Sequence, residues 1–426
     1  MLTVVIVFFI LLLLGMPVAF AIGISGATFF ITNDLPYSIV VQKVISSTQS
    51  FTLLAIPLFV FAGNLMNKTG ITARMIKLSN VLVGHMYGHI GQVSVVLSTL
   101  MGGVSGSANA DAAMESRILG PDMIKRGYSK GWGAAINGLS SLITATIPPS
   151  MGLIIYGSVG EVSIGRLFIA GIVPGIIMMI ALMITVNITA KKRSYKPKRV
   201  QRASFKEVVK AFADCIWALL FPVILIAGIR FGLMTPSEAG AFAAFYAIFV
   251  GAFIHKELTF ETFIQTLKDS VRDIGVIMLI VAISGIFGYG IVYDSIPQTL
   301  ASLLIGITSS KAIMILIIIA FLVFAGMFVE TTVCALLLTP ILLPIVKNVG
   351  VDPVHFGILM MTVVTAGIMS PPVGIALYTV SDIMGCKPEE TAKEAVPFYI
   401  AVLAVVLIIA FLPDLVLFLP NLVYGS

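Results

Sequence analysis

The chain of 426 residues is 58% hydrophobic, and only 11% of its residues are charged. Long apolar runs recur from one end to the other, which indicates a protein that crosses a membrane many times and excludes an ordinary soluble domain. The net charge of +6 does not indicate nucleic-acid binding, because eight of the 26 basic residues lie in one short segment without acids, residues 191–206. The three cysteines lie far apart and form neither a disulfide framework nor a zinc-binding pattern.

The N-terminal segment, residues 1–14, is apolar but shorter than the ~20 residues that a spanning helix needs. Both a crossing and a non-crossing segment are compatible with this length. It has no basic residue before Lys43 and no small-residue cleavage site, so we expect a membrane segment rather than a signal peptide.

The basic segment at 191–206 is expected in the cytoplasm, because cytoplasmic loops are enriched in lysine and arginine. This orientation sets the direction of the neighbouring segments. We predict spanning segments at residues 165–190, 213–232, 238–254 and 274–293.

A rare pattern of two prolines, a glycine and a tyrosine occurs twice, beginning at Pro148 and again at Pro371. The number of residues from Pro148 to Pro371, called the repeat spacing below, also separates Pro121 from Pro344. Most of the chain is therefore a duplication. Two consecutive prolines interrupt a helix. The two interrupted helices, 131–160 and 354–380, are separated by an odd number of predicted segments, which predicts inverted repeats.

A second kind of interruption lies before each proline pair. Small and polar residues at 102–111 and at 326–332 divide apolar runs into two arms, which predicts two re-entrant hairpins that open to opposite sides. A short amphipathic stretch precedes each hairpin, at 71–83 and 296–307, and is expected along the membrane surface.

These features predict an all-α polytopic membrane protein with an inverted structural repeat, two re-entrant hairpins and two discontinuous helices. We divide the chain into a first scaffold with its arm helix (1–84), a first transport unit (85–160), a spanning helix (161–190), the basic cytoplasmic loop (191–206), a second scaffold with its arm helix (207–310), a second transport unit (311–380) and a C-terminal loop with a spanning helix (381–426).

The interruptions offer oxygen atoms suited to sodium. A sodium ion within a membrane needs about five or six oxygens with little extra charge, and unwound backbone carbonyls with hydroxyls supply them. We therefore predict at least two sodium sites, one in each half. The first comprises Gly102, Ser105, Ser107, Thr144, Thr146 and Pro148; the second comprises Gly326, Thr331, Thr332, Thr365, Gly367 and Met369.

The half-helices that start after each interruption direct their positive dipole ends toward the middle of the membrane, where an anionic group could bind. The predicted substrate-binding residues are Ser105, Asn109, Asp111, Pro149, Ser150 and Pro372. Acids within a membrane are costly and indicate function. Glu330 could instead only cap its hairpin, and Glu115 with Arg117 could form an internal pair or a cytoplasmic contact. For any single glycine or serine, close helix packing is the competing explanation.

Aromatic residues near the predicted segment ends, Tyr128, Trp132 and Tyr156, are expected in the membrane–water interface.

In combination, these motifs resemble the large membrane subunit of tripartite ATP-independent periplasmic (TRAP) transporters of bacterial inner membranes. The resemblance rests on Ser105-Gly106-Ser107, Pro121 with Gly127-Tyr128, Ile147-Pro148-Pro149-Ser150, residues 350–357 and Ser370-Pro371-Pro372-Val373-Gly374. It implies an elevator-type ion transporter fold, sodium coupling, a separate small four-helix membrane subunit and a periplasmic substrate-binding protein that delivers an organic acid. The stretch 107–111 resembles the sialic acid branch.

Four alternatives compete with this interpretation, and two of them stay open at this level. The chain could be a stand-alone sodium-coupled dicarboxylate or citrate transporter, or a TRAP subunit for C4-dicarboxylates. An intramembrane enzyme is disfavoured because the sequence has no His-Glu-x-x-His and no Gly-x-Ser-x-Gly motif. A channel is disfavoured because two hairpins of opposite entry suit alternating access.

Overall fold

The computed structural model describes residues 2–199, 201–308 and 310–425, and every regular element in these ranges is a helix. The first half contains α1 (Leu2–Leu13), α2 (Val18–Thr32), α3 (Tyr37–Thr48), η1 (Phe51–Leu54), α4 (Ala55–Lys68), α5 (Ile71–Val83), α6 (His89–Gly102), α7 (Ala108–Lys125), α8 (Lys130–Thr146), α9 (Met151–Gly160) and α10 (Ile164–Lys192). The second half contains α11 (Phe205–Arg230), α12 (Pro236–Phe249), η2 (Val250–Ile254), α13 (Phe260–Tyr293), α14 (Ile296–Ile307), α15 (Lys311–Phe328), α16 (Thr331–Asn348), α17 (Pro353–Gly367), α18 (Ile375–Met384), α19 (Pro388–Phe411) and α20 (Pro413–Tyr424).

The all-α membrane fold is confirmed. Within the described ranges, eight helices are long and apolar enough to cross a membrane, or nine when α8 and α9 are counted as one broken span.

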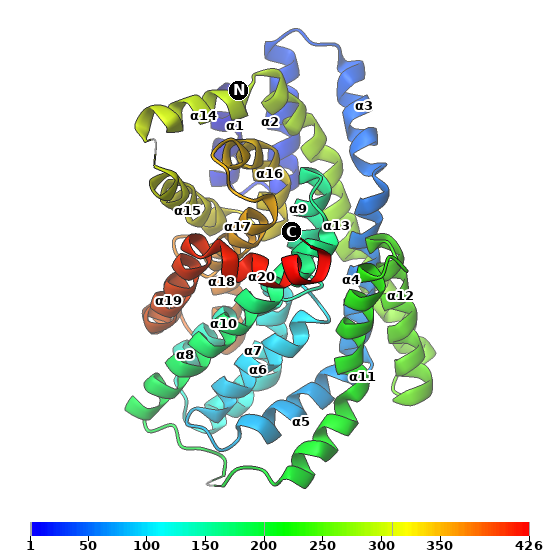
Figure 1. Cartoon of the computed structure of the whole chain (residues 1–426), viewed down its shortest axis with the longest axis vertical. Helices are drawn as coiled ribbons and strands as arrows, with labels where there is room; N and C mark the ends of the chain where they lie inside the picture. Colours follow the sequence, from blue (N-terminus) through cyan, green and yellow to red (C-terminus); the bar gives the residue numbers. More distant parts are fainter. Residues whose placement is uncertain (1, 200, 309, 426) are drawn as a thin grey trace.

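The duplication is visible element by element. Helix α7 begins at Ala108 and α16 at Thr331, and α8 begins at Lys130 and α17 at Pro353, so both pairs keep the repeat spacing. The amphipathic stretches form α5 and α14 with the predicted bounds. These two helices lie toward opposite ends of the molecule (Figure 1), as expected for inverted repeats.

Both predicted interruptions are present in each half. Helix α8 ends at Thr146, and α9 restarts at Met151 with a bend of 42°. Helix α17 ends at Gly367, and α18 begins at Ile375. The hairpin tips are residues 103–107 between α6 and α7 and residues 329–330 between α15 and α16. In each half, both hairpin arms pack against the first part of the broken helix.

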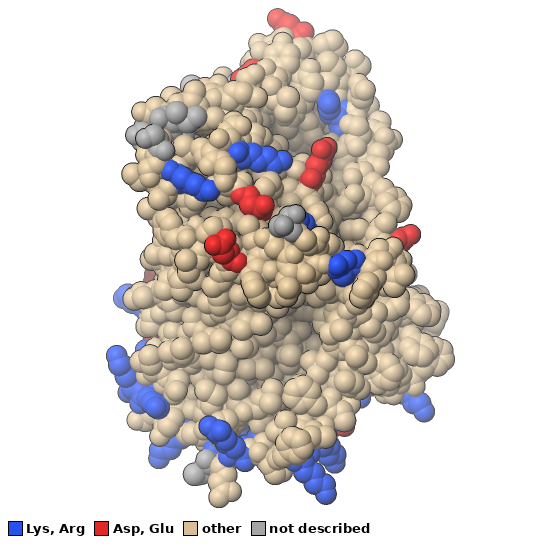
Figure 2. Space-filling view, viewed as in Figure 1, with Lys and Arg blue, Asp and Glu red and all other residues tan. Residues whose placement is uncertain are grey.

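Positive charge is concentrated at one end of the molecule. Lysines and arginines gather at the lower end of the view in Figure 2, where Figure 1 places the connection from α10 to α11. The part of this connection up to residue 199 forms a strap that is hydrogen-bonded to the connection between α5 and α6. The carbonyl of Tyr195 accepts a hydrogen bond from Gly88 N at 2.9 Å, and the backbone of Lys198 donates to Gly84 O at 3.0 Å.

The prediction that three aromatic residues lie in the membrane interface is wrong. Trp132 and Tyr156 are fully buried, and Tyr128 is nearly so. Tyr195 of the strap stacks on Tyr128 with ring centroids 4.2 Å apart, so protein rather than lipid headgroups covers these rings. The hydroxyl of Tyr156 donates to Pro353 O at 2.7 Å, which joins the two halves.

Candidate functional site

The first hairpin tip contacts the first proline break. Gly106 has a φ of +64°, and its carbonyl accepts a hydrogen bond from Met151 N at 3.4 Å. A Cβ atom at this position would lie only 2.2 Å from Pro149 O. Only glycine therefore permits both the backbone turn and the close approach. Gly102 similarly packs against Ile147.

The second half repeats this contact. Gly374, which follows the second proline pair and has a φ of +50°, donates from its amide to Met327 O at 2.9 Å. The backbones of α15 and α17 are also in close contact, because a Cβ atom at Gly367 would lie 2.6 Å from Gly326 Cα. In both halves, the sequence-predicted tip and break are therefore joined directly.

The half-helices meet across the repeats. Helix α9 packs against α16, and a Cβ atom at Gly152 would lie 3.6 Å from Thr331 Cγ2, so the first turns of these helices adjoin. Helix α7 packs against α18. In each pair, a helix that begins at a hairpin tip packs against a helix that begins at the break of the other half.

Two predicted sodium ligands of the first half, Thr144 and Thr146, donate hydrogen bonds to backbone carbonyls. Thr144 Oγ1 donates to Ser98 O on α6 at 3.0 Å, whereas Thr146 Oγ1 donates to Leu142 O at 2.9 Å in its own helix. A hydroxyl that donates its proton keeps its lone pairs, so these bonds leave both groups able to ligate a cation.

In the second half, Thr365 Oγ1 donates to Met361 O at 2.6 Å, and the hydroxyl of Thr332 bonds to Glu330. Thr331 Oγ1 is buried without a hydrogen-bond partner, although most buried polar atoms in proteins have one. The carbonyl of Met369 already accepts a hydrogen bond from Tyr399.

The predicted substrate-binding residues of the two breaks differ in their exposure to solvent. Pro149 and Ser150 are buried, and Ser150 Oγ accepts a hydrogen bond from Leu153 N at 3.4 Å as the N-cap of α9. Pro372 in the second break is exposed. The first break is thus covered by protein, whereas the second reaches the molecular surface.

The polar residues of the first tip differ in burial, because Asp111 is buried whereas Ser105, Ser107 and Asn109 are partly exposed. Ser105 Oγ donates to Asp111 Oδ1 at 2.7 Å, and Ser107 is the N-cap residue of α7. Two oxygens, Asp111 Oδ2 and Asn109 Oδ1, are buried and have no partner. These atoms could bind a ligand that the hairpin encloses.

The two remaining acids, Glu330 and Glu115, each accept hydrogen bonds from neighbouring groups. Glu330 caps α16, because its carboxylate accepts a hydrogen bond from Thr332 N at 3.0 Å. The alternative that Glu115 pairs with Arg117 is wrong: Arg117 is exposed, and Glu115 is buried on the opposite side of α7 among serine hydroxyls.

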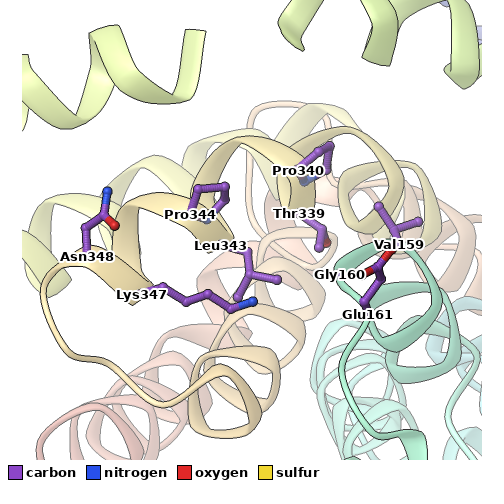
Figure 3. A pocket seen from close by; sticks show the side chains of 9 residues that line it. All are labelled: Val159, Gly160, Glu161, Thr339, Pro340, Leu343, Pro344, Lys347 and Asn348. Carbon is purple, nitrogen blue, oxygen red and sulfur yellow. The ribbon is translucent and has the colours of Figure 1, made fainter. Parts of the chain in front are cut away.

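Two surface cavities lie elsewhere. The first cavity has a volume of about 380 Å³ and lies between the end of α9 and α16. Its lining includes Glu161, Thr339 and Lys347 (Figure 3). The other, about 500 Å³, lies between the α9–α10 connection and α11–α12. Neither cavity contains a predicted sodium or substrate residue.

Sequence reasoning missed three contacts of the site. Tyr399 lies in α19, outside both predicted transport units, yet its hydroxyl donates to Met369 O at 2.5 Å. Gly63 of α4 and Pro222 of α11 pack against the first hairpin tip. A glycine and a proline within apolar helices are the only local signals that these two positions gave.

Residues 5–415 match the model of the family described as "Tripartite ATP-independent periplasmic transporter, DctM component". The chain belongs to this family. The TRAP assignment is consistent with a relative from Vibrio cholerae, the sialic acid TRAP transporter large permease protein SiaM, which is 37% identical over 418 residues and covers 97% of each chain. A second relative, the 2,3-diketo-L-gulonate TRAP transporter large permease protein YiaN of Escherichia coli, is 35% identical over 405 residues, with 95% of each chain covered.

The fold of this TRAP permease also resembles the solved structure of the YdaH transporter from Alcanivorax borkumensis, with a TM-score of 0.65 over 88% of each chain and 10% identity. The chain is therefore a multi-pass inner-membrane transport subunit and not an enzyme. The family assignment removes the alternative of a stand-alone dicarboxylate or citrate transporter. TRAP membership also implies a system that has a small membrane subunit and a periplasmic binding protein.

A conservative change tests the unpredicted contact at the second break. Tyr399→Phe should lower the thermal unfolding temperature of the purified protein, because the buried Met369 carbonyl would lose its donor at a cost of ~1–3 kcal/mol. The exposed Tyr37 supplies the matched control, Tyr37→Phe. Equal unfolding temperatures for both variants would show that the bond contributes nothing.

Proposed function

We propose that this TRAP permease couples the inward flow of sodium to the uptake of an organic acid, most specifically sialic acid (N-acetylneuraminate), across the inner membrane. The observation that carries the proposal is the direct bond between each hairpin tip and the proline break of the same half, Met151 N to Gly106 O and Gly374 N to Met327 O. This arrangement exposes unwound backbone at two related places, which is where transporters bind ions and substrate.

Sodium is the ion that the available ligands favour. The groups at both tips are hydroxyls and carbonyls, and among the described residues no group of three or more His, Cys, Asp or Glu side chains could hold a transition metal. The buried, unpartnered oxygen of Thr331, a predicted sodium ligand, supports a cation site in the second half.

The substrate proposal rests on the tip chemistry and on the relatives. The first tip offers the amide of Asn109 and the hydroxyls of Ser105 and Ser107, which suit the hydroxyl and amide groups of a sugar acid. Ser150 at the start of α9 would bind the carboxylate. The names of both relatives described above refer to sugar acids. A C4-dicarboxylate would need a further cation close to the tips.

Transport would follow an elevator mechanism. The moving part comprises residues 85–160 and 311–380, and the fixed part comprises the scaffold helices with the N-terminal segment. The proposed partners are a small four-helix membrane subunit against the fixed part and a periplasmic binding protein that delivers the substrate.

Reconstitution tests this function. The chain is placed in liposomes with its small subunit, the binding protein is added outside, and uptake of labelled N-acetylneuraminate is measured with an inward sodium gradient. Uptake should require both sodium and the binding protein, and choline should not replace sodium. Succinate as the labelled substrate distinguishes the C4-dicarboxylate alternative. Uptake that persists without sodium would contradict the coupling, and transport of succinate alone would contradict the substrate.

A further inference from the structure

A buried carboxylate in the first hairpin is surrounded by hydroxyls from two neighbouring helices. Glu115 of α7 is fully buried and accepts hydrogen bonds from Ser94 at 2.5 Å and Ser98 at 2.6 Å, both on α6. A third bond comes from Ser140 of α8 at 3.1 Å. The proposed sodium and substrate sites do not include Glu115.

The duplication provides an internal comparison for this cluster. At the repeat spacing, Glu115 corresponds to Leu338 and Ser140 to Val363. Helix α15, the counterpart of α6, contains neither serine nor threonine between Lys311 and Phe328. The corresponding helices of the second half therefore lack these polar groups. Packing alone does not explain the cluster in the first half.

Asp111 adds a second buried acid to this region. It lies one turn before Glu115 on α7, where residues four apart are neighbours, and its own counterpart in the second half is Cys334. One of its oxygens is buried without a partner. Among the described residues, neither acid forms an ion pair with lysine or arginine.

The surrounding helices supply little compensating charge. Of α6, α8 and α18, which pack against α7, only α8 contains a lysine or arginine, and this residue, Lys130, lies at its first position and donates to Gly385 O at 3.2 Å. Uncompensated charge inside a membrane protein is costly. A cation bound close by would balance it.

The cluster also reaches the predicted sodium site. Ser98 donates its hydroxyl to Glu115, and the carbonyl of the same residue accepts the hydroxyl of Thr144, a predicted sodium ligand. On the other side, Asp111 accepts from Ser105 at the tip. The two acids are therefore linked to the first predicted sodium site through Ser98 and Ser105. The acid of the second half, Glu330, lies at the tip itself and caps α16.

We infer that Glu115 is a positioning residue that supplies a fixed counter-charge behind the first sodium site, without ligating the ion. The two sodium sites then differ, because a carboxylate on the hairpin arm lies behind the first site and an apolar residue occupies the equivalent position behind the second. This inference rests on the proposed sodium coupling and specifies how the two halves divide that task.

The test replaces the charge and keeps the shape. Glu115→Gln should raise the sodium concentration for half-maximal uptake about tenfold, because removing a charge within two helical turns of a cation in a medium of intermediate dielectric constant has an effect of this order. Uptake at saturating sodium should be retained. The sodium concentration that raises the unfolding temperature of the detergent-purified protein should shift by a similar factor, with choline chloride as the ionic-strength control.

Three further variants separate charge from structure. Glu115→Asp, which keeps the charge, should leave the sodium dependence near that of the original protein. Glu161→Gln removes an exposed acid and should change nothing. If Glu115→Gln does not fold, Glu115→Met tests the same loss of charge with a side chain of similar length.

The failure of this inference is distinct from that of the proposed function. If the original protein does not need sodium, the proposed coupling is wrong. If it needs sodium but Glu115→Gln keeps the same sodium dependence in uptake and in thermal unfolding, the counter-charge role is wrong. A lower unfolding temperature with an unchanged sodium concentration for half-maximal uptake would assign Glu115 a structural role only. A changed pH dependence of uptake with an unchanged sodium concentration for half-maximal uptake would assign it to proton binding. Both results overturn the inference.

Discussion

A disulfide between the first hairpin tip and the scaffold should stop uptake completely, and reduction should restore it. Gly103 of the tip packs against Pro222 of α11, and a Cβ atom at Gly103 would lie 2.9 Å from the Cβ of Pro222. This separation is slightly below the ~3.5–4.5 Å that joins the Cβ atoms of a disulfide, so a small adjustment permits the bond. In the proposed elevator the hairpin moves and α11 stays fixed, so each transport cycle would have to separate these residues.

The experiment combines Gly103→Cys and Pro222→Cys in a chain whose three natural cysteines, Cys215, Cys334 and Cys386, are replaced by serine or alanine. Uptake is measured after oxidation and again after reduction, and the fraction of crosslinked protein is determined by mass spectrometry. Each single-cysteine variant is the control for the substitution itself. Full uptake by a crosslinked population would exclude the elevator and favour a rocking or gating movement.

Gly326→Ala should abolish transport and lower stability by ~1–3 kcal/mol, the usual range for overpacking a tight contact. The added Cβ atom would lie 2.4 Å from Val364 O and 3.1 Å from Gly367 Cα. Both neighbours are backbone atoms, so no side chain can rotate away. The second hairpin would have to move off α17, which would separate Gly326 from Gly367, two proposed ligands of the second sodium site.

A glycine in an open position provides the matched control. A Cβ atom at Gly275 of α13 would have no neighbour within 4 Å, so Gly275→Ala should be neutral or slightly stabilising in a helix. Thermal unfolding and sodium-driven uptake are measured for both variants. Normal uptake by Gly326→Ala would show that the hairpin and α17 do not need this contact during transport.

Much of the fold could be predicted because its signals are local. The proline pairs at 148–149 and 371–372 interrupt helices wherever they occur, and the glycine and serine residues at 102–107 cannot continue an apolar helix. The repeat spacing then predicted the second half from the first. The same local signals identified the tip and break residues as candidate binding-site residues. The contacts of Gly106 and Gly374 show that tip and break meet in both halves.

The predictions that failed concerned residues whose partners are distant in sequence. Trp132 was expected at the membrane surface, but Tyr195, from the strap after α10, folds over the aromatic cluster around it. Glu115 was considered as a partner of Arg117, its close neighbour in the chain. The helix turns these two side chains to different sides, and the serines that contact Glu115 come from α6 and α8.

By itself, the sequence determined the helical class, the duplication, the two hairpins, the two broken helices and the family, because apolar length, proline and glycine act on the chain within a few residues. Only the tertiary structure decided that the first break is buried and the second exposed, that Tyr399 occupies the carbonyl of Met369, and that the first tip rests on Pro222. These features depend on which helices pack together, and helix packing is set by the summed shape of many side chains rather than by any one motif.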